Sequence, residues 1–195
     1  MWRNTPAEQG AITTLSKSAC AILNNKKGNT TPIKVSDAVK SILKKVGKQV
    51  EDEVNVYGDQ FGFANLSPFS VLDVDIDDMQ GNYLSDYSDA ISKLKNDYNA
   101  NDISDLETKM SQKLGHTVKI SNGKTIIING ETMTWHHHQN CKTMQLVPFE
   151  IHDPTYHIGG KNILDNYTDK DEAKKLMPFS PEEITKHFLC PKNKK

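Results

Sequence analysis

The chain of 195 residues is long enough for one domain with a hydrophobic core, or for a small catalytic module with a helical partner region. Its 36% hydrophobic and 25% charged content is typical of globular proteins, and no run of about 18 apolar residues could cross a bilayer. The net charge is −1, but residues 109–195 hold 13 lysines against 9 acidic residues. This basic part suits a polyanionic partner, although its charge alone does not indicate a nucleic-acid-binding protein.

The N-terminal sequence MWRNTPAEQGAITTLSK has no apolar segment before a cleavage site, so we expect no signal peptide. The three cysteines Cys20, Cys141 and Cys190 are widely spaced and form no CxxC pair. This argues against a disulfide framework and against a thiolate zinc site.

Residues 1–33 are polar and rich in turn formers, and we expect an extended or linker segment there. Residues 34–115 are predicted to be mainly helical. Apolar residues at three-to-four spacing predict a helix over 35–50, with Ser36 or Asp37 as its cap. Residues 51–83 have no settled period, which indicates loops around one short strand. Two further helices are predicted over 84–98 and 104–114, the second with Ser104 and Glu107 as a capping box and with Gly115 at its end.

Four acidic residues between 73 and 78 raise the question of a calcium site. The glycine and the distal glutamate of an EF-hand loop are missing at the required spacing. A solvated strand face or turn is therefore the favoured interpretation of this segment, which contains Asp73, Asp75, Asp77 and Asp78.

Residues 116–195 are predicted to form a separate domain that begins with a β-meander. Alternating apolar residues surround two Asn-Gly pairs, at Asn122 and at Asn129, and such pairs favour hairpin turns. Another strand is expected over 142–147, followed after Pro148 by a helical segment. Two helices are predicted in the tail, over 169–176 and from residue 180. The fold class is α+β, with a helical N-terminal part, the meander and C-terminal helices.

Five of the seven histidines fall within the 22 residues from His136 to His157. Neighbouring residues of a strand point to opposite faces, so His136 and His138 should share one side and His137 the other. Imidazole can accept a proton from water near neutral pH, and it can also bind a divalent metal ion. A surface or tag origin does not fit a triplet inside a strand, whereas capping or packing is a real alternative for His152 and His157.

Four short segments carry a family resemblance: TWHHHQ from Thr134, KTMQLVP from Lys142, IHD from Ile151 and HIGG from His157. In order and spacing they resemble the WHH family of the HNH/endonuclease VII nuclease superfamily. Members of that family are commonly C-terminal toxin domains of bacterial polymorphic toxins. The resemblance covers about 27 residues, and residues 1–115 carry no motif that we can name.

The resemblance implies a ββα-metal core, in which two strands and a helix hold one divalent ion, zinc, magnesium or another transition metal. It implies that His136 is the first metal ligand, His137 the general base and His152 a ligand from the helix. His157 takes the place of a further ligand or a phosphate-stabilising residue. Five residues correspond to about 140° of an ideal helix, so His152 and His157 should not both face the ion from one regular helix.

Two residues depart from the expected pattern. Cys141 stands in a turn where a small, flexible residue is favoured, and it could bind metal only if it faces inward. Pro154 implies that the helix with His152 is very short, or that a new helix begins with Asp153 as its cap and Pro154 as its first residue. Trp135 is expected in the core. Candidate substrate contacts are Lys142, Lys161 and His138, although a solvated surface is the alternative for the lysines.

The resulting hypothesis is an endonuclease toxin that hydrolyses phosphodiester bonds, with DNA favoured over RNA, in the cytoplasm of a competitor cell. Such a toxin requires a cognate immunity protein, which should be acidic. The alternatives are a zinc-stabilised interaction domain with a closed tetrahedral site, a nuclease of phage or restriction origin, and a ribonuclease.

Overall fold

The structure is a computed structural model, and it describes residues 32–56, 63–155 and 159–166. Residues 1–31 of the predicted segment 1–33, both predicted tail helices and His157 lie outside these residues. Within the described part, no helix is long and apolar enough to span a membrane.

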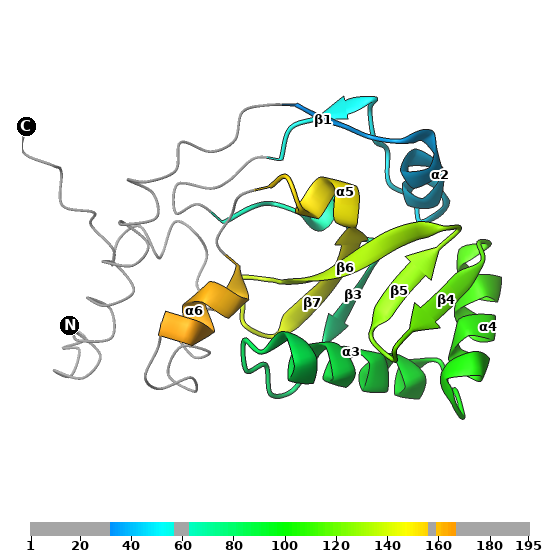
Figure 1. Cartoon of the computed structure of the whole chain (residues 1–195), viewed down its shortest axis with the longest axis vertical. Helices are drawn as coiled ribbons and strands as arrows, with labels where there is room; N and C mark the ends of the chain where they lie inside the picture. Colours follow the sequence, from blue (N-terminus) through cyan, green and yellow to red (C-terminus); the bar gives the residue numbers. More distant parts are fainter. Residues whose placement is uncertain (1–31, 57–62, 156–158, 167–195) are drawn as a thin grey trace, which may run out of the picture.

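A five-stranded antiparallel sheet with helices around it forms the centre of the fold (Figure 1). The strand order is β3-β7-β6-β5-β4, and a separate two-stranded sheet pairs β1 with β2. The fold is thus mixed, with helices and an antiparallel sheet, in agreement with the α+β prediction. The strands are β1 (Ile33–Lys34), β2 (Glu53–Val54), β3 (Leu72–Asp75), β4 (Val118–Ser121), β5 (Thr125–Ile128), β6 (Glu131–His137) and β7 (Thr143–Pro148).

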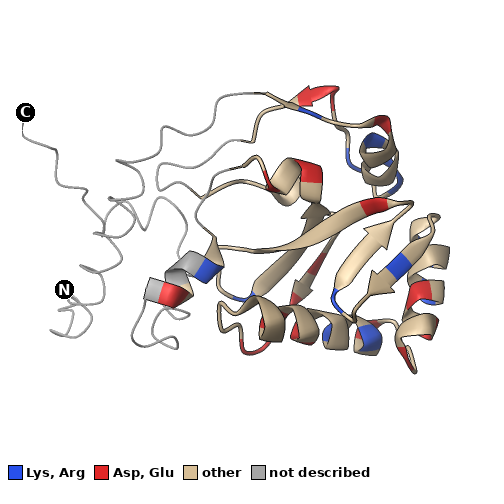
Figure 2. Cartoon of the chain, in the orientation of Figure 1, with Lys and Arg blue, Asp and Glu red and all other residues tan. Residues whose placement is uncertain are grey.

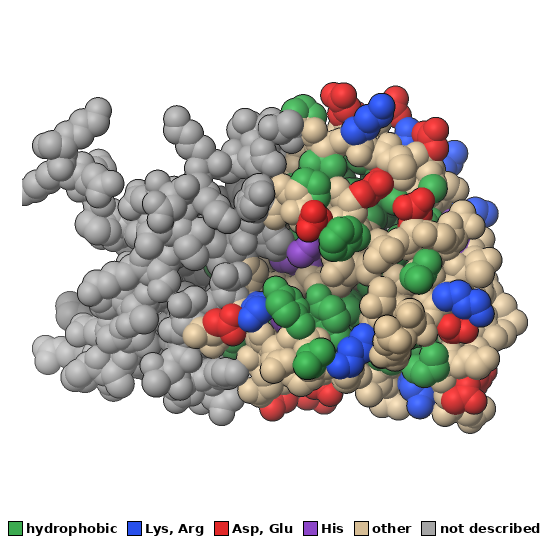
Figure 3. Space-filling view, viewed as in Figure 1, with side chains coloured by type: hydrophobic (Ala, Val, Ile, Leu, Met, Phe, Trp, Pro, Cys, Tyr) green, Lys and Arg blue, Asp and Glu red, His purple; other side chains and the backbone are tan. Residues whose placement is uncertain are grey.

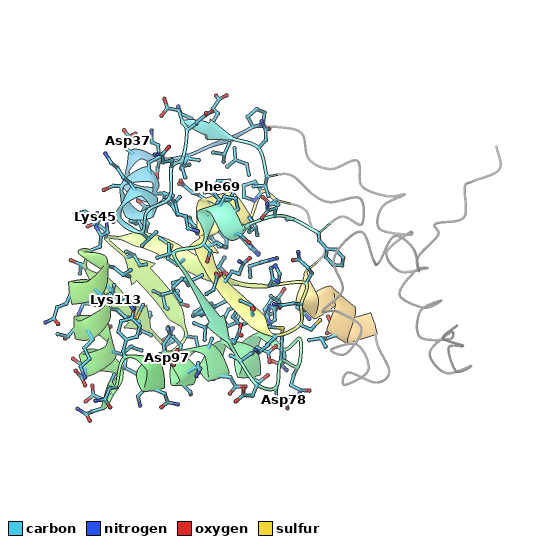
Figure 4. All side chains as sticks on the ribbon, turned by 180° about the vertical axis from the view of Figure 1, so that it is seen from behind. Asp37, Lys45, Phe69, Asp78, Asp97 and Lys113 are labelled. Atoms are coloured by element: carbon cyan, nitrogen blue, oxygen red, sulfur yellow. The ribbon has the colours of Figure 1, made fainter. Side chains whose placement is uncertain are left out.

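Helices α3 and α4 lie within one residue of their predicted bounds, α2 is shorter than predicted, and α6 was not predicted. Helix α2 is shorter than the predicted 35–50 because the chain turns at Gly47, which has a φ of +79°. Ser36 caps it as predicted, and its hydroxyl accepts the amide of Val39 at 3.3 Å. Figure 4 labels its two ends, Asp37 and Lys45. The helices are α2 (Asp37–Lys45), α3 (Tyr83–Asp97), α4 (Ile103–Leu114), α5 (Phe149–His152) and α6 (Gly160–Asn166), with a 3₁₀ turn, η1 (Ser67–Phe69).

The predicted capping box of α4 is wrong. Asp102 is the cap, and its carboxylate accepts the amide of Asp105 at 2.8 Å. Glu107 instead accepts the amide of Ile120 at 2.7 Å, on the edge strand β4. The glutamate is thus used for a contact with the sheet edge, which a local pattern cannot reveal. Gly115 ends the helix with a φ of +66°, as predicted.

The hairpins of the meander form where the sequence predicts them. Both residues of each Asn-Gly pair have positive φ, with 51° and 66° at Asn122 and Gly123 and 51° and 87° at Asn129 and Gly130. These signs belong to type I′ turns, whose twist matches that of the strands. The next pairing, between β6 and β7, places His136 opposite Gln145 and His137 opposite Met144.

The one strand predicted within 51–83 is β3, and β2 is a second, two-residue strand. The acidic residues of β3 make surface contacts: Asp75 pairs with Lys142 at 2.7 Å, and Asp73 accepts the hydroxyl of Ser70 at 2.6 Å. Because β3 is hydrogen-bonded to β7, the sheet draws strands from both sides of the predicted boundary at residue 115. That boundary stays a prediction.

Candidate active site

Strand β6 separates the two neighbouring histidines at its end, as its alternation predicts. His136 is 1% exposed and shares a face of the sheet with Gln145, its partner in the register. His137 is 3% exposed, on the opposite face, with Trp135 two residues before it. Trp135 is buried in the core, as predicted. Each histidine therefore meets a different helix.

On one face, the ring of His136 meets the ring of His152 from α5. The two ring centres are 5.6 Å apart, and the planes are tilted by 60°. Helix α5 has only four residues, and the amide of Thr155 closes the following turn on the carbonyl of His152 at 3.1 Å. The first of the two expectations for Pro154, a very short helix, is therefore confirmed.

On the other face, His137 is held by a residue that the sequence analysis missed. Its Nε2 lies 3.0 Å from a carboxylate oxygen of Asp86, in the first turn of α3. Asp86 is fully buried and is the only buried carboxylate among the described residues. It lies four residues before Ala90 and eight before Leu94, on the buried stripe of α3. An acid on an apolar stripe is a signal that could have found it.

Backbone amides fix the carboxylate of Asp86 from the other side. The amides of Gln80 and Asn82 each donate to one of its oxygens at 3.0 Å, and the hydroxyl of Ser85 donates at 3.1 Å. Burial, the largest influence, raises the pKa of Asp86, but the hydrogen bonds from His137 and from the Gln80 amide outweigh it. The pKa is lowered as a result.

Two tyrosines of α3 flank the ring of His137. Tyr87 stacks on it with ring centres 6.0 Å apart, and Tyr83 meets it edge-on at 5.6 Å. The hydroxyl of Tyr87 also donates to the carbonyl of Trp135 at 3.0 Å, which ties the helix to the strand just before the histidines. The N-terminal end of α3 thus forms the environment of His137.

Two glycines, Gly159 and the first residue of α6, Gly160, allow the start of α6 to lie against the end of β6. A Cβ atom on Gly159 would come within 2.7 Å of the carbonyl oxygen of His137 and 3.2 Å of the ring of His136. A Cβ atom on Gly160 would come closer still to the carbonyl oxygen of His138. The Gly-Gly pair is therefore needed because the backbone at 159–160 lies in close contact with the backbone at the end of β6.

The predicted substrate-binding residues lie at the rim of this centre or beyond it. The ring of His138 accepts the amide of Asn140 at 3.3 Å inside the β6–β7 turn, and burial lowers its pKa. Lys142 pairs with Asp75. Lys161 pairs with Asp165 at 2.5 Å and lies 5.0 Å from the ring centre of Tyr83. None of these contacts tests a role in substrate binding.

Cys141 occupies the turn with a φ of +54° and is buried, with its sulfur 3.9 Å from the carbonyl oxygen of Gly160.

Figure 3 shows histidine side chains in a recess of the surface, with hydrophobic side chains beside them. The large hydrophobic side chains that are exposed among the described residues are Tyr83, Leu84 and Phe149, two at the start of α3 and one at the start of α5.

The histidine centre lies inside a stretch that matches a known family. Residues 127–167 match the WHH family. That family is described as a nuclease of the HNH/ENDO VII superfamily with conserved WHH, and Trp135, His136 and His137 lie in the matched stretch. The match supports a nuclease in this part of the chain. No curated protein matches the chain.

Nucleases of the HNH/ENDO VII superfamily typically use a divalent metal ion, and the chemistry of this centre fits one. Metal–nitrogen bonds of about 2.0–2.1 Å place the centre of a ligating imidazole roughly 3 Å from the ion. Two rings 5.6 Å apart can therefore share one ion, and His136 and His152 are the residues that would hold it. Within the described residues no group of three or more potential ligands occurs. His157, the predicted third ligand, lies outside them.

Proposed function

We propose that the chain is a metal-dependent endonuclease, with β6, β7 and α5 as a ββα-metal core. The observation that carries this proposal is the division of His136 and His137 between two partners inside the WHH match. One histidine faces a second potential ligand, His152, and the other faces a buried carboxylate, Asp86. Hydrolysis of a phosphodiester needs both functions, a bound cation and a base for the attacking water.

In the proposed mechanism, His136, His152 and His157 would hold one divalent ion, and such an ion would supply positive charge for the phosphate when bound. His137 accepts a proton from the attacking water. His137 follows the proposed metal ligand His136 directly in the sequence. The same rigid end of β6 therefore positions both the base and the ligand. Lys142, Lys161 and His138 contact the substrate backbone.

We propose DNA as the substrate. The excess of lysine in residues 109–195 supports a polyanion but does not separate DNA from RNA. Figure 2 shows acidic and basic residues interspersed along α3 and α4, so these two helices offer no basic face.

The biological role proposed is that of a toxin delivered into the cytoplasm of a competing cell, with an acidic immunity protein in the producing cell. The support is the resemblance of the histidine segment to toxin nucleases and the basic character of residues 109–195. Cytosolic expression should then stop growth with loss of the nucleoid before any loss of ribosomal RNA. Harmless expression of an enzyme that is active in vitro would contradict this role.

Purified protein incubated with supercoiled plasmid tests the enzymatic proposal. Cleavage should require a divalent ion and should stop when a chelator is added, with RNA as the parallel substrate. Cleavage of RNA alone would change the substrate assignment. Tight metal binding without cleavage of either nucleic acid would contradict the enzyme and favour a metal-stabilised interaction domain.

A further inference from the structure

We propose that Asp86 is a positioning residue for the general base. It holds His137 in the tautomer with the proton on Nε2, so that Nδ1 is the nitrogen that accepts the proton from water. The proposal rests on the proposed function and extends it, because Asp86 lies 41 residues before the matched stretch 127–167. A region without a recognised motif thus completes the catalytic centre.

The tautomer follows from hydrogen-bond chemistry. A carboxylate can only accept hydrogen bonds, so the nitrogen that faces it must carry a proton. Within the described residues, the hydrogen bond from Nε2 to Asp86 at 3.0 Å is the only one that the His137 ring makes. In the neutral ring a proton on Nε2 leaves Nδ1 unprotonated, and only that nitrogen can act as a base.

The orientation of the pair is also fixed. Asp86 cannot turn away because backbone amides of Gln80 and Asn82 bind its two oxygens. His137 cannot swing freely because Tyr83 and Tyr87 lie against its ring. A base that is held in one position before the substrate arrives needs no reorganisation during the reaction.

A purely structural role at the start of the helix does not account for this carboxylate. In α4, Asp105 also holds the start of its helix: its carboxylate accepts the amide of Asn101, four residues earlier, at 2.8 Å. Asp86 accepts the amide of Asn82, also four residues earlier. Asp105 remains partly exposed and pairs with Lys109, whereas Asp86 is fully buried against a histidine. Burying a carboxylate costs free energy, and capping a helix does not require it.

The test compares Asp86→Asn with the matched control Asp105→Asn. Nitrogen-15 NMR of histidine-labelled protein at pH 8, with the His137 signal assigned from a His137→Gln variant, reports which ring nitrogen carries the proton. Wild type and the control should show the Nε2–H tautomer. In Asp86→Asn the amide can donate as well as accept, so this preference should weaken or reverse.

Plasmid cleavage supplies the second measurement. Asp86→Asn should lower kcat by about 10²–10⁴-fold, the contribution typical of a general base, and should leave KM and metal affinity within a few-fold of wild type. The control should cleave like wild type. An Nδ1–H tautomer in wild type, or a wild-type kcat in Asp86→Asn, would overturn the proposal.

The two proposals fail in different ways. If wild type shows the Nε2–H tautomer but cleaves no nucleic acid, the nuclease proposal fails and the hydrogen bond still stands. If Asp86→Asn does not fold, the tautomer of the wild-type protein decides the question without the variant.

Discussion

At the scale of single residues, the centre depends on the alternation of one strand. His136 and His137 are consecutive, yet one faces His152 on α5 and the other faces Asp86 on α3. The register opposite Gln145 and Met144 gives each histidine its own face of the strand and its own partner. A metal ligand and a base can therefore be neighbours in the sequence without competing for the same ion.

The acidic partner gives a prediction for stability against pH. The pKa of Asp86 is below its ordinary value of 3.8 in the folded protein. Its contribution to the free energy of unfolding is therefore present above about pH 3.8 and is lost as the pH falls further, through the lower folded-state pKa. Urea unfolding between pH 6 and pH 2.5 should show a steeper loss in wild type than in Asp86→Asn. Parallel pH profiles for the two proteins would contradict the assignment.

At the scale of elements, two segments hold the end of β6 from different directions. The start of α3 contributes Asp86, Tyr83 and Tyr87. The glycine pair at the start of α6 lies against the backbone of His137 and His138. The residues that make these contacts from α3 and from the glycine pair are not histidines. Both contacts can therefore be tested with substitutions outside Trp135, His136 and His137.

Gly160→Ala should destabilise the fold by about 1–3 kcal/mol, the range expected when an added methyl group forces a close-packed backbone apart. It should also reduce cleavage, because the carbonyl that would be displaced belongs to His138. Gly47→Ala is the control: it introduces strain from a φ of +79°, but its Cβ atom would meet nothing within 4 Å. Loss of cleavage in the control to the same degree would show that the effect is global instability.

The local elements were predictable because their signals are local. The Asn-Gly pairs fix two hairpin turns, the three-to-four spacing indicates the helices, and Pro148 marks the change from strand to helix. The histidine triplet beside Trp135 likewise indicates a nuclease centre through its local sequence. The cap of α4 was predicted wrongly because Glu107 is committed to the sheet edge, 13 residues further along the chain.

The role of Asp86 could not be predicted for the same reason as that of Glu107, because its partner is distant in the sequence. Its partner His137 is 51 residues away, and no pattern of spacing connects a helix start with a strand end at that distance. The glycines at 159 and 160 stand out in the sequence only as part of a motif. Their close approach to the backbone of β6 depends on tertiary structure.

At the scale of the whole molecule, the sheet crosses the boundary of the recognised motif. Strand β3 pairs with β7, α3 supplies Asp86, and the amide of Ser36 before α2 donates to Glu150 on α5 at 2.8 Å. The matched stretch 127–167 therefore lacks the edge strand β3 and the partner of His137 when it is taken alone. Ser36, strand β3 and helix α3 thus contact the same sheet and helix that carry the histidines.

A fragment of residues 116–195 should consequently be far less active than the full chain, by at least about 10²-fold, since it loses the residue that orients the base. Circular dichroism and plasmid cleavage would measure folding and activity together. A matched fragment of residues 32–195 removes only the preceding segment and keeps every described contact. Full activity in the 116–195 fragment would show an independent nuclease domain and would contradict this view of the fold.

The measurement that tests the account most directly is metal affinity and plasmid cleavage side by side in wild type, His137→Ala and His152→Ala. His137→Ala should bind the metal ion within a few-fold of wild type and lose cleavage by about 10²-fold or more, because a base touches water and not the ion. His152→Ala should lose at least the roughly 10–100-fold in metal affinity seen when even an outer partner of a metal site is removed. Loss of the metal in His137→Ala, or unchanged affinity in His152→Ala, would contradict the division of roles on which the proposed mechanism rests.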